Sequence, residues 1–163
     1  QQTMHAVEKA WTTLDIYTAT QALKTFGTGL LPSHYLEMVK SRLYDDDAAA
    51  AWTLHRIVRD FLAAFSPVCP FFTHHLSSTL YATSSVDARR FPEPPLDDLA
   101  SGTQEGDALR TMTAALVEFN SDTWRAKKDA GISLNAPISD VSVPDSLAAL
   151  TSSLAAMHKL EQL

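Results

Sequence analysis

The carboxylates that stand closest together in the sequence are Asp45, Asp46 and Asp47, which precede a run of four alanines. A calcium-binding loop needs a glycine at its sixth position and a glutamate at its twelfth, and both are missing here. An Asp directly before a helix often accepts hydrogen bonds from the free amides of the first turn. We therefore expect a turn and a helix N-cap at this place.

Cys69, His74 and His75 are the residues with the best metal-ligand chemistry. Adjacent histidines on a helix diverge by about 100°, and no second ligand pair follows at a suitable spacing. We expect two partly exposed histidines and a buried thiol. The Gly27-Thr28-Gly29 run has neither a third glycine nor a following Gly-Lys-Ser/Thr, so it does not predict a phosphate loop. With no nucleophile in a recognisable elbow, we expect no catalytic residue and no metal in this chain.

Phosphate-binding chemistry depends on the 13 Lys and Arg, which are outnumbered by 19 Asp and Glu for a net charge of −6. This balance argues against nucleic-acid binding, because counterion release from a basic face supplies much of the affinity for phosphate. The cations nevertheless form local groups: Lys40 and Arg42, Arg56 and Arg59, Arg89 and Arg90, and Arg125 with Lys127 and Lys128. Local basic patches are therefore compatible with the sequence.

Length and composition indicate one ordinary globular domain, with or without a small appendage. The chain has 163 residues, 45% of them hydrophobic and 20% charged, with 5 Gly and 8 Pro. No apolar stretch approaches the ~20 residues that span a bilayer, and the N-terminus does not resemble a signal peptide. The single Cys69 cannot form an internal disulfide and is compatible with a reducing cytosol.

Apolar residues recur at helical spacing along most of the chain. This spacing, with its caps and breakers, predicts the following elements: a helix through Ala6–Trp11, a second from near Asp15 or Thr18, a kink or short loop over Gly27–Pro32, a helix capped by Ser33, helices over Ala48–Phe65 and Pro70–Tyr81, a long helix over Gln104–Ala130 closed by Gly131 in a left-handed conformation, a strand over Ile138–Val143, and a last helix capped by Asp145.

Each helix is expected to bury one stripe of apolar side chains. The predicted stripes are Leu36, Val39 and Leu43; Ala51, Leu54, Val58, Phe61 and Phe65; Phe72, Leu76 and Leu80; Leu109, Met112, Leu116, Phe119 and Thr123; and Leu147, Leu150, Leu154 and Met157. For Trp11, Trp52 and Trp124 we expect core or interface packing rather than stacking on bases.

Several motifs resemble a known family. The run Tyr35–Tyr44, a helix of about twenty residues after it, and Ser66–Thr73 are similar to the anticodon-binding helical domain of class I aminoacyl-tRNA synthetases. Glu37 and the Pro-Phe-Phe-Thr run at Pro70–Thr73 resemble the valyl members, whereas isoleucyl members usually differ there. Further along, Trp124–Ile138 resembles the family's Arg-x-x-Lys helix end and its Gly-x-Ser-Leu-Asn-Ala-Pro turn.

The resemblance implies a mainly α fold, an antiparallel helical bundle with a short C-terminal strand and helix. It places the bundle over residues 1–131 and the start of a small appendage, or a C-terminal helix, over 132–163. It also implies that the chain is a fragment of a larger synthetase, an ATP-dependent valine–tRNA ligase. The signatures of the catalytic domain are absent from this sequence, so ATP, Mg²⁺ and aminoacylation would belong to a missing part of the parent protein.

The implied partners are a valine-accepting tRNA, bound at its anticodon stem and loop, and the parent's catalytic domain, without DNA or membrane and in the cytoplasm. The resemblance carries Lys40 and Arg42 (from Val-Lys-x-Arg) and Arg125 and Lys128 (from the helix end) as tRNA-binding residues, and Arg89 and Arg90 could add phosphate contacts. The alternative for these cations is simple solvation or helix capping. The alternative functions are a helical protein-interaction module without RNA binding and a small enzyme of unrecognised type.

Overall fold

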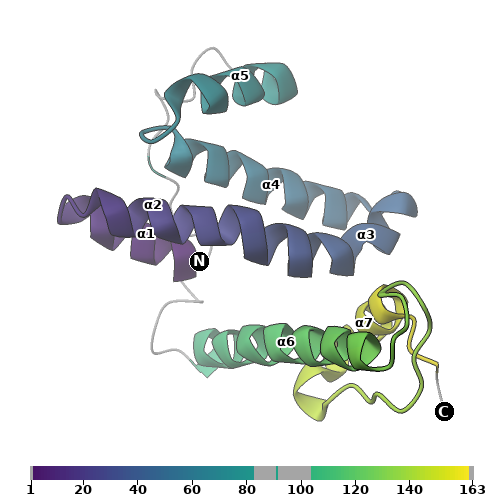
Figure 1. The fold of residues 1–163 in the computed structure, drawn as a ribbon. Helices are drawn as coiled ribbons and strands as arrows, with labels where there is room; N and C mark the ends of the chain where they lie inside the picture. The colour runs from purple at the N-terminus through teal and green to yellow at the C-terminus, as the bar shows by residue number, and fades with distance from the viewer. Residues whose placement is uncertain (1, 83–90, 92–103, 162–163) are drawn as a thin grey trace. The chain divides into compact units, whose positions relative to one another are not determined.

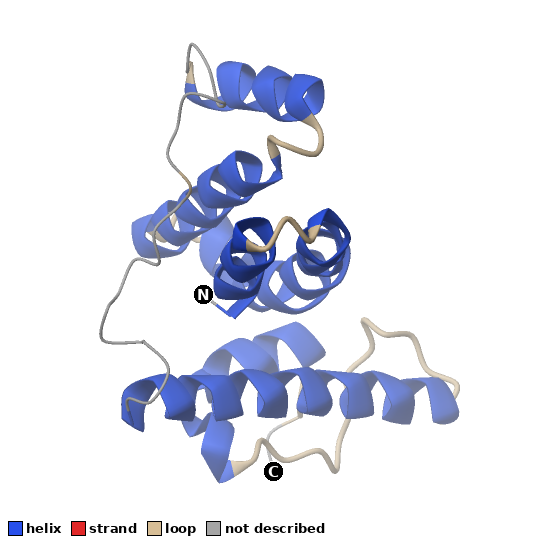
Figure 2. Ribbon diagram, turned by 90° about the vertical axis from the view of Figure 1, so that its left-hand side faces the viewer, coloured by secondary structure: helices blue, strands red, loops and turns tan. Residues whose placement is uncertain are grey.

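The computed structural model describes residues 2–82, 91 and 104–161 (Figure 1). The elements in chain order are α1 (Gln2–Thr12), α2 (Ile16–Thr25), the π-helix η1 (Phe26–Leu36), α3 (Glu37–Tyr44), α4 (Ala48–Phe65), α5 (Pro70–Tyr81), α6 (Gln104–Asp129), the 3₁₀-helix η3 (Asp145–Leu150) and α7 (Thr151–His158). Within these described ranges there is no strand (Figure 2). The predicted mainly α class is therefore confirmed.

The chain divides into two compact units, which are described separately. Unit 1 comprises Gln1–Pro32 and Asp46–Pro95, and unit 2 comprises Ser33–Asp45 and Leu96–Leu163. This division follows contacts in space. The boundary that the sequence predicts after residue 131 stays a prediction.

The core of unit 1 forms where α1, α2 and α4 meet. Its buried residues are Val7, Ala10, Ala19, Leu23 and Ala64, with Met4, Trp11, Phe61 and Phe65 packed around them. The turn between α1 and α2 ends at Asp15, whose side chain accepts a hydrogen bond from the Thr18 amide at 3.0 Å. Such a cap satisfies one of the free amides at the start of a helix. The predicted start of the second helix is thereby confirmed.

Helix α4 has the predicted bounds because a local signal sets its start. An oxygen of Asp47 accepts hydrogen bonds from the amides of Ala49 at 2.9 Å and Ala50 at 3.1 Å, as expected of an N-cap. The predicted stripe of this helix is only half-buried, and its fully buried residues are Ala50, Leu62 and Ala64.

Helix α5 also has the predicted bounds, but the prediction of its buried face is wrong. Thr73 and Ser77 are buried, whereas Phe72 is 57% and Leu80 is 54% exposed. The Thr73 hydroxyl donates to backbone carbonyls within its own first turn, so this small polar side chain is buried without an unpaired group. The larger apolar side chains of α5 consequently lie on its uncovered side.

The short loop predicted over Gly27–Pro32 is not found, because the whole of Phe26–Leu36 is helical, with the wider π geometry. The alternative of a kink stays a prediction. Ser33 lies inside this segment and does not cap a helix. A β-carbon added to Gly27 would lie 2.7 Å from Cζ of Phe61, whose ring stacks on Phe65 with centroids 5.5 Å apart. Gly27 is therefore needed for close packing against α4 and not for a turn.

In unit 2 the core is built on Phe119, Leu147 and Leu154, with Met112, Leu116, Leu150 and Met157 among the side chains packed around them. Helix α6 ends as predicted, since Gly131 has φ +68° and the Ile132 amide donates to the Lys127 carbonyl at 3.0 Å. The last helix begins as a 3₁₀ turn. Its N-cap is Pro144, without a side-chain hydrogen bond, so the predicted cap by Asp145 is wrong.

The predicted strand over Ile138–Val143 is also not found. Ile138 forms a single parallel bridge with Leu160, in which the Ile138 amide donates to the Lys159 carbonyl at 3.2 Å. A strand needs a neighbouring strand along its length. In the described part of unit 2 only Ile138 pairs in this way, through its one bridge with Leu160. Val141 and Val143 pack against the core instead.

We predict opposite effects for alanine at the two glycines of η1. Gly27→Ala should lower the free energy of unfolding by about 1–3 kcal/mol, because the new methyl group overpacks against the held Phe61 ring. Gly29→Ala, which meets no atom within 4 Å, should raise it by up to about 1 kcal/mol through better helix propensity. Urea unfolding of both variants measures this difference. Equal stabilisation by the two would contradict the packing role of Gly27.

Candidate functional site

Four of the six residues predicted to bind tRNA lie in the described part of the chain, and all four belong to unit 2. Lys40 and Arg42 are on α3, Arg125 and Lys128 are on α6, and all are exposed. The predicted contacts of Arg89 and Arg90 lie outside the described residues.

The two cations of α3, Lys40 and Arg42, are both exposed. Nζ of Lys40 lies 3.5 Å from a carboxylate oxygen of Glu37, and both side chains are about half exposed. An exposed pair of this kind contributes little to stability, about 0–1 kcal/mol, so Lys40 can exchange this partner for another anion. Arg42 stands in the last turn of the helix, where a positive charge is favourable in any case. The structure thus leaves capping as an adequate explanation for Arg42.

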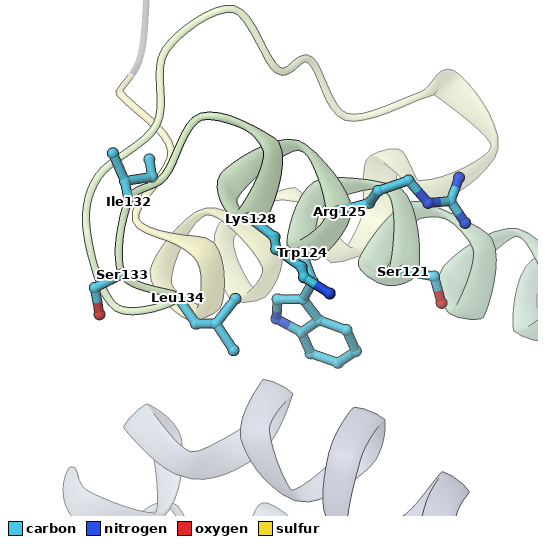
Figure 3. Close-up of a pocket in the computed structure, with 7 residues that line it drawn as sticks. All are labelled: Ser121, Trp124, Arg125, Lys128, Ile132, Ser133 and Leu134. Atoms are coloured by element: carbon cyan, nitrogen blue, oxygen red, sulfur yellow. The ribbon is translucent and has the colours of Figure 1, made fainter.

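Arg125 and Lys128 of α6 line a pocket of about 640 Å³ at the end of that helix (Figure 3). We call it the helix-end pocket. Its lining residues are Ser121, Trp124, Arg125, Lys128, Ile132, Ser133 and Leu134. The first four are spaced at i, i+3, i+4 and i+7 and therefore share one face of α6. The other three come from the turn that follows Gly131. An Arg125 guanidinium nitrogen bonds the exposed Asp122 carboxylate at 3.1 Å, within the same helix.

Lys127 fixes the turn that forms one side of this pocket. Its side chain is fully buried, and its ammonium donates to the carbonyls of Leu134 at 2.8 Å, Ala136 at 2.7 Å and His158 at 2.8 Å. An ammonium has three donors, so all are used. Burial, and secondarily the charge of Lys159, lowers the pKa of Lys127. The three carbonyl dipoles take the place that water would have around the charge.

Sequence reasoning grouped Lys127 with the surface cations and missed this role. The signal that could have found it is periodicity. Lys127 continues the sequence positions Leu116, Asn120 and Thr123 in steps of three and four, and Asn120 and Thr123 are buried. Lys128 lies one position round the helix and is exposed.

A hydrogen-bonded chain of three side chains supports Trp124. His158 Nε2 lies 2.8 Å from Asn120 Oδ1, and Asn120 Nδ2 lies 3.1 Å from His34 Nδ1. Since an amide oxygen accepts and an amide nitrogen donates, His158 carries its proton on Nε2 and His34 Nδ1 is unprotonated. The indole of Trp124 packs on both imidazoles, with ring centroids 5.4 Å from His34 and 5.7 Å from His158. These hydrogen bonds therefore hold Trp124 in place through the two imidazoles on which its indole packs.

The two histidines that bond Asn120, His34 and His158, are held neutral. Burial, together with the nearby Lys127 charge, lowers the pKa of His158 to about 4, and burial lowers the pKa of His34. Within the described residues, His158 Nδ1 has no hydrogen-bond partner. A proton added there would be buried beside a cation without an acceptor.

The side chains of the helix-end pocket suit the binding of a phosphate group and a flat ring. Two cations and two hydroxyls can contact phosphate, and an indole with two aliphatic side chains offers apolar surface to a flat ring. None of the seven lining residues is a carboxylate or histidine that could serve as a base. In the described part of the chain, no group of three or more His, Cys, Asp or Glu is placed to hold a metal ion. No described helix is long and apolar enough to cross a membrane.

The sequence from residue 1 to residue 143 matches the family described as the anticodon-binding domain of tRNA ligase. The chain belongs to this family. The relatives it matches among curated proteins are valine–tRNA ligases, which confirms the resemblance to valyl-tRNA synthetases found in the sequence.

Three of these relatives show how much of the chain is matched. The chain is 31% identical over 166 residues to the valine–tRNA ligase of Aeropyrum pernix, covering 96% of the chain and 19% of the relative. It is 30% identical over 131 residues to that of Saccharolobus solfataricus, covering 80% and 15%, and 31% identical over 129 residues to that of Methanothrix thermoacetophila, covering 77% and 14%. The chain thus spans at most about a fifth of these relatives. No solved structure matches it.

We predict that Lys127→Met lowers the free energy of unfolding by about 3 kcal/mol or more. Methionine keeps the apolar stem but leaves three carbonyls without their donor, and each unpaired buried group costs about 1–3 kcal/mol. Urea unfolding measures the loss. The neighbouring exposed Lys128→Met is the matched control and should change stability by less than about 0.5 kcal/mol. Equal effects of the two substitutions would refute the structural role of Lys127.

We also predict a loss of stability in mild acid that depends on His158. Its folded pKa of about 4 lies below the ordinary 6.5, so the unfolded chain takes up the proton first as the pH falls. The contribution of His158 is present above about pH 6.5 and is lost down to about pH 4, by about 2–3 kcal/mol in total. His34 adds to this in the same direction.

The measurement is the free energy of unfolding at about pH 7 and about pH 4.5 for the native chain and for His158→Gln, because Gln can still donate to Asn120 but does not titrate. Subtracting the two removes the titration of the surface carboxylates. An equal pH dependence in both proteins would show that His158 is not held neutral.

Proposed function

We propose that this chain binds the anticodon stem and loop of a valine-accepting tRNA, and positions that tRNA for aminoacylation by a catalytic domain elsewhere in the same protein. The observation that carries the proposal is the family match over residues 1–143, together with relatives that are named valine–tRNA ligases. ATP and Mg²⁺ would act in the catalytic domain. A cytoplasmic location is part of the same proposal.

The chain would contribute by holding the RNA. Cations contact phosphates and fix the register of the RNA, while unpaired loop bases present their edges and faces to side chains. Arg125 and Lys128 stand together at the helix-end pocket and suit the phosphate role. Lys40 and Arg42 are the second exposed pair in unit 2. The overall charge of −6 means that these local pairs must supply the electrostatic attraction.

Binding of the chain to a valine tRNA transcript, and to the same transcript with its anticodon replaced, tests the proposal at low and at moderate salt. We expect tighter binding to the valine anticodon, weakening as salt rises because bound phosphates release counterions. Equal binding to both transcripts would overturn anticodon recognition and leave phosphate contact alone. The absence of binding even at low salt would favour the protein-interaction module.

We predict that the double substitution Arg125→Gln, Lys128→Gln weakens tRNA binding about tenfold or more at moderate salt. It should also reduce the slope of log affinity against log salt by about 1–2, since up to two phosphate contacts are lost. Titration of labelled tRNA at several salt concentrations gives both numbers. Lys24→Gln, an exposed cation of α2 in unit 1, is the control. A slope unchanged from that of the native chain would remove the helix-end pocket from the interface.

A further inference from the structure

The outward side of α4 in unit 1 carries an aromatic and cationic surface that none of the predicted site residues belongs to. Trp52, His55, Arg56 and Arg59 are spaced at i, i+3, i+4 and i+7, so they share one face of the helix. Trp52 is 68% exposed, so it does not pack in the core. An exposed ring beside cations offers a stacking surface for a base together with donors for a phosphate.

Tyr81, the last residue of α5, extends this face and orders two of its members. The guanidinium carbon of Arg59 lies 5.6 Å from the centre of the Tyr81 ring. The His55 ring meets the same tyrosine edge to face, with centroids 5.9 Å apart. Held side chains lose less conformational entropy when they bind a ligand. We call Trp52, His55, Arg56, Arg59 and Tyr81 the α4 face.

Charge on the α4 face is unevenly compensated. Arg56 is paired with Asp60 at 2.7 Å, one turn along the same helix. Arg59 forms no ion pair with a carboxylate in the described part of the chain, and its contact with Tyr81 leaves the guanidinium edge available for an acceptor. The face is therefore locally positive on a chain whose net charge is −6. A negatively charged ligand such as the phosphate backbone of an RNA complements this face.

We propose that the α4 face binds unpaired nucleotides of an RNA, with Trp52 stacking on a base and Arg59 contacting a phosphate. The inference rests on the proposed function, and adds a site in unit 1 to the cations of unit 2. Single-stranded RNA is recognised through exposed aromatic rings that stack on bases and through neighbouring cations that follow the backbone. The bases of a duplex are stacked inside the helix and cannot reach Trp52, so the ligand is a loop or an end.

The first test compares two RNAs on the native chain and on Trp52→Ala. One is an anticodon stem-loop transcript, and the other is the same stem as a fully paired duplex without a loop. We expect Trp52→Ala to weaken binding of the stem-loop about fivefold to a hundredfold, the range for loss of one stacked base, and to leave duplex binding unchanged. Trp52→Phe should restore most of the affinity. Tyr17→Ala, which removes an aromatic ring that is 74% exposed on α2, is the matched control.

A second readout concerns the contact itself. Indole fluorescence of the native chain should be quenched by the stem-loop, and Trp52→Phe should lose the part of the quenching that Trp52 contributes although binding persists; equal quenching in the two proteins would contradict stacking on Trp52. Arg59→Gln should weaken binding and reduce the salt slope by about 1. Because the substituted side chains are on the protein surface, loss of folding is not the expected cause, and circular dichroism of each variant checks this.

The outcomes separate this inference from the proposed function. If the native chain binds the stem-loop, and Arg125→Gln with Lys128→Gln weakens it while Trp52→Ala and Arg59→Gln do not, the α4 face is not an RNA site but the proposed function stands. If Trp52→Ala and Tyr17→Ala weaken binding equally, the effect is not specific and the inference is wrong. If the native chain binds neither RNA at low salt, both are wrong.

Discussion

The arrangement of unit 2 depends on the satisfaction of one buried charge. The Lys127 ammonium is fully buried without a carboxylate, and its three donors reach carbonyls in the turn after α6 and at the end of α7. Two of the bonds end in the turn and the third at the end of α7, so a single side chain ties both segments to the end of α6. A charge buried without these partners would cost several kcal/mol. The turn and the end of α7 must therefore stay where the ammonium needs them, and the helix-end pocket inherits its shape from this requirement.

The hydrogen-bonded side chains of His158, Asn120 and His34 are linked to the same buried cation. His158 offers its backbone carbonyl to Lys127 and its imidazole to Asn120. Burial, and secondarily repulsion by the ammonium, disfavours a charged imidazole, so His158 is neutral and its Nε2 proton is directed at Asn120. The Asn120 amide then has its nitrogen directed at His34. The orientation of each group is fixed by the one before it, and Trp124 packs on the two imidazoles that result.

The sequence predicts the ends of helices in this chain better than their buried faces. Asp47, Pro70 and Gly131 set helix ends through bonds and dihedral preferences that involve only adjacent residues, and these predictions are confirmed. The burial of Thr73 and Ser77 in place of Phe72 and Leu80 depends on which side of α5 meets another helix, and periodicity alone does not contain that information.

The η1 segment is a second example. Its glycines and Pro32 indicate a loop in the local pattern, and that pattern does not show that the Phe61 ring approaches Gly27. Periodicity places Lys127 on the buried side of α6, but the three carbonyls that accept from it come from the turn after α6 and the end of α7, and only the fold shows them.

The uncovered side of α5 has a consequence for how the chain behaves in solution. Phe71 is 91% exposed next to Phe72, and such neighbouring rings attract their counterparts on other molecules. At neutral pH a net charge of −6 opposes these encounters through colloidal repulsion. The exposed rings of α5 therefore depend on this repulsion to stay apart, and salt screens it.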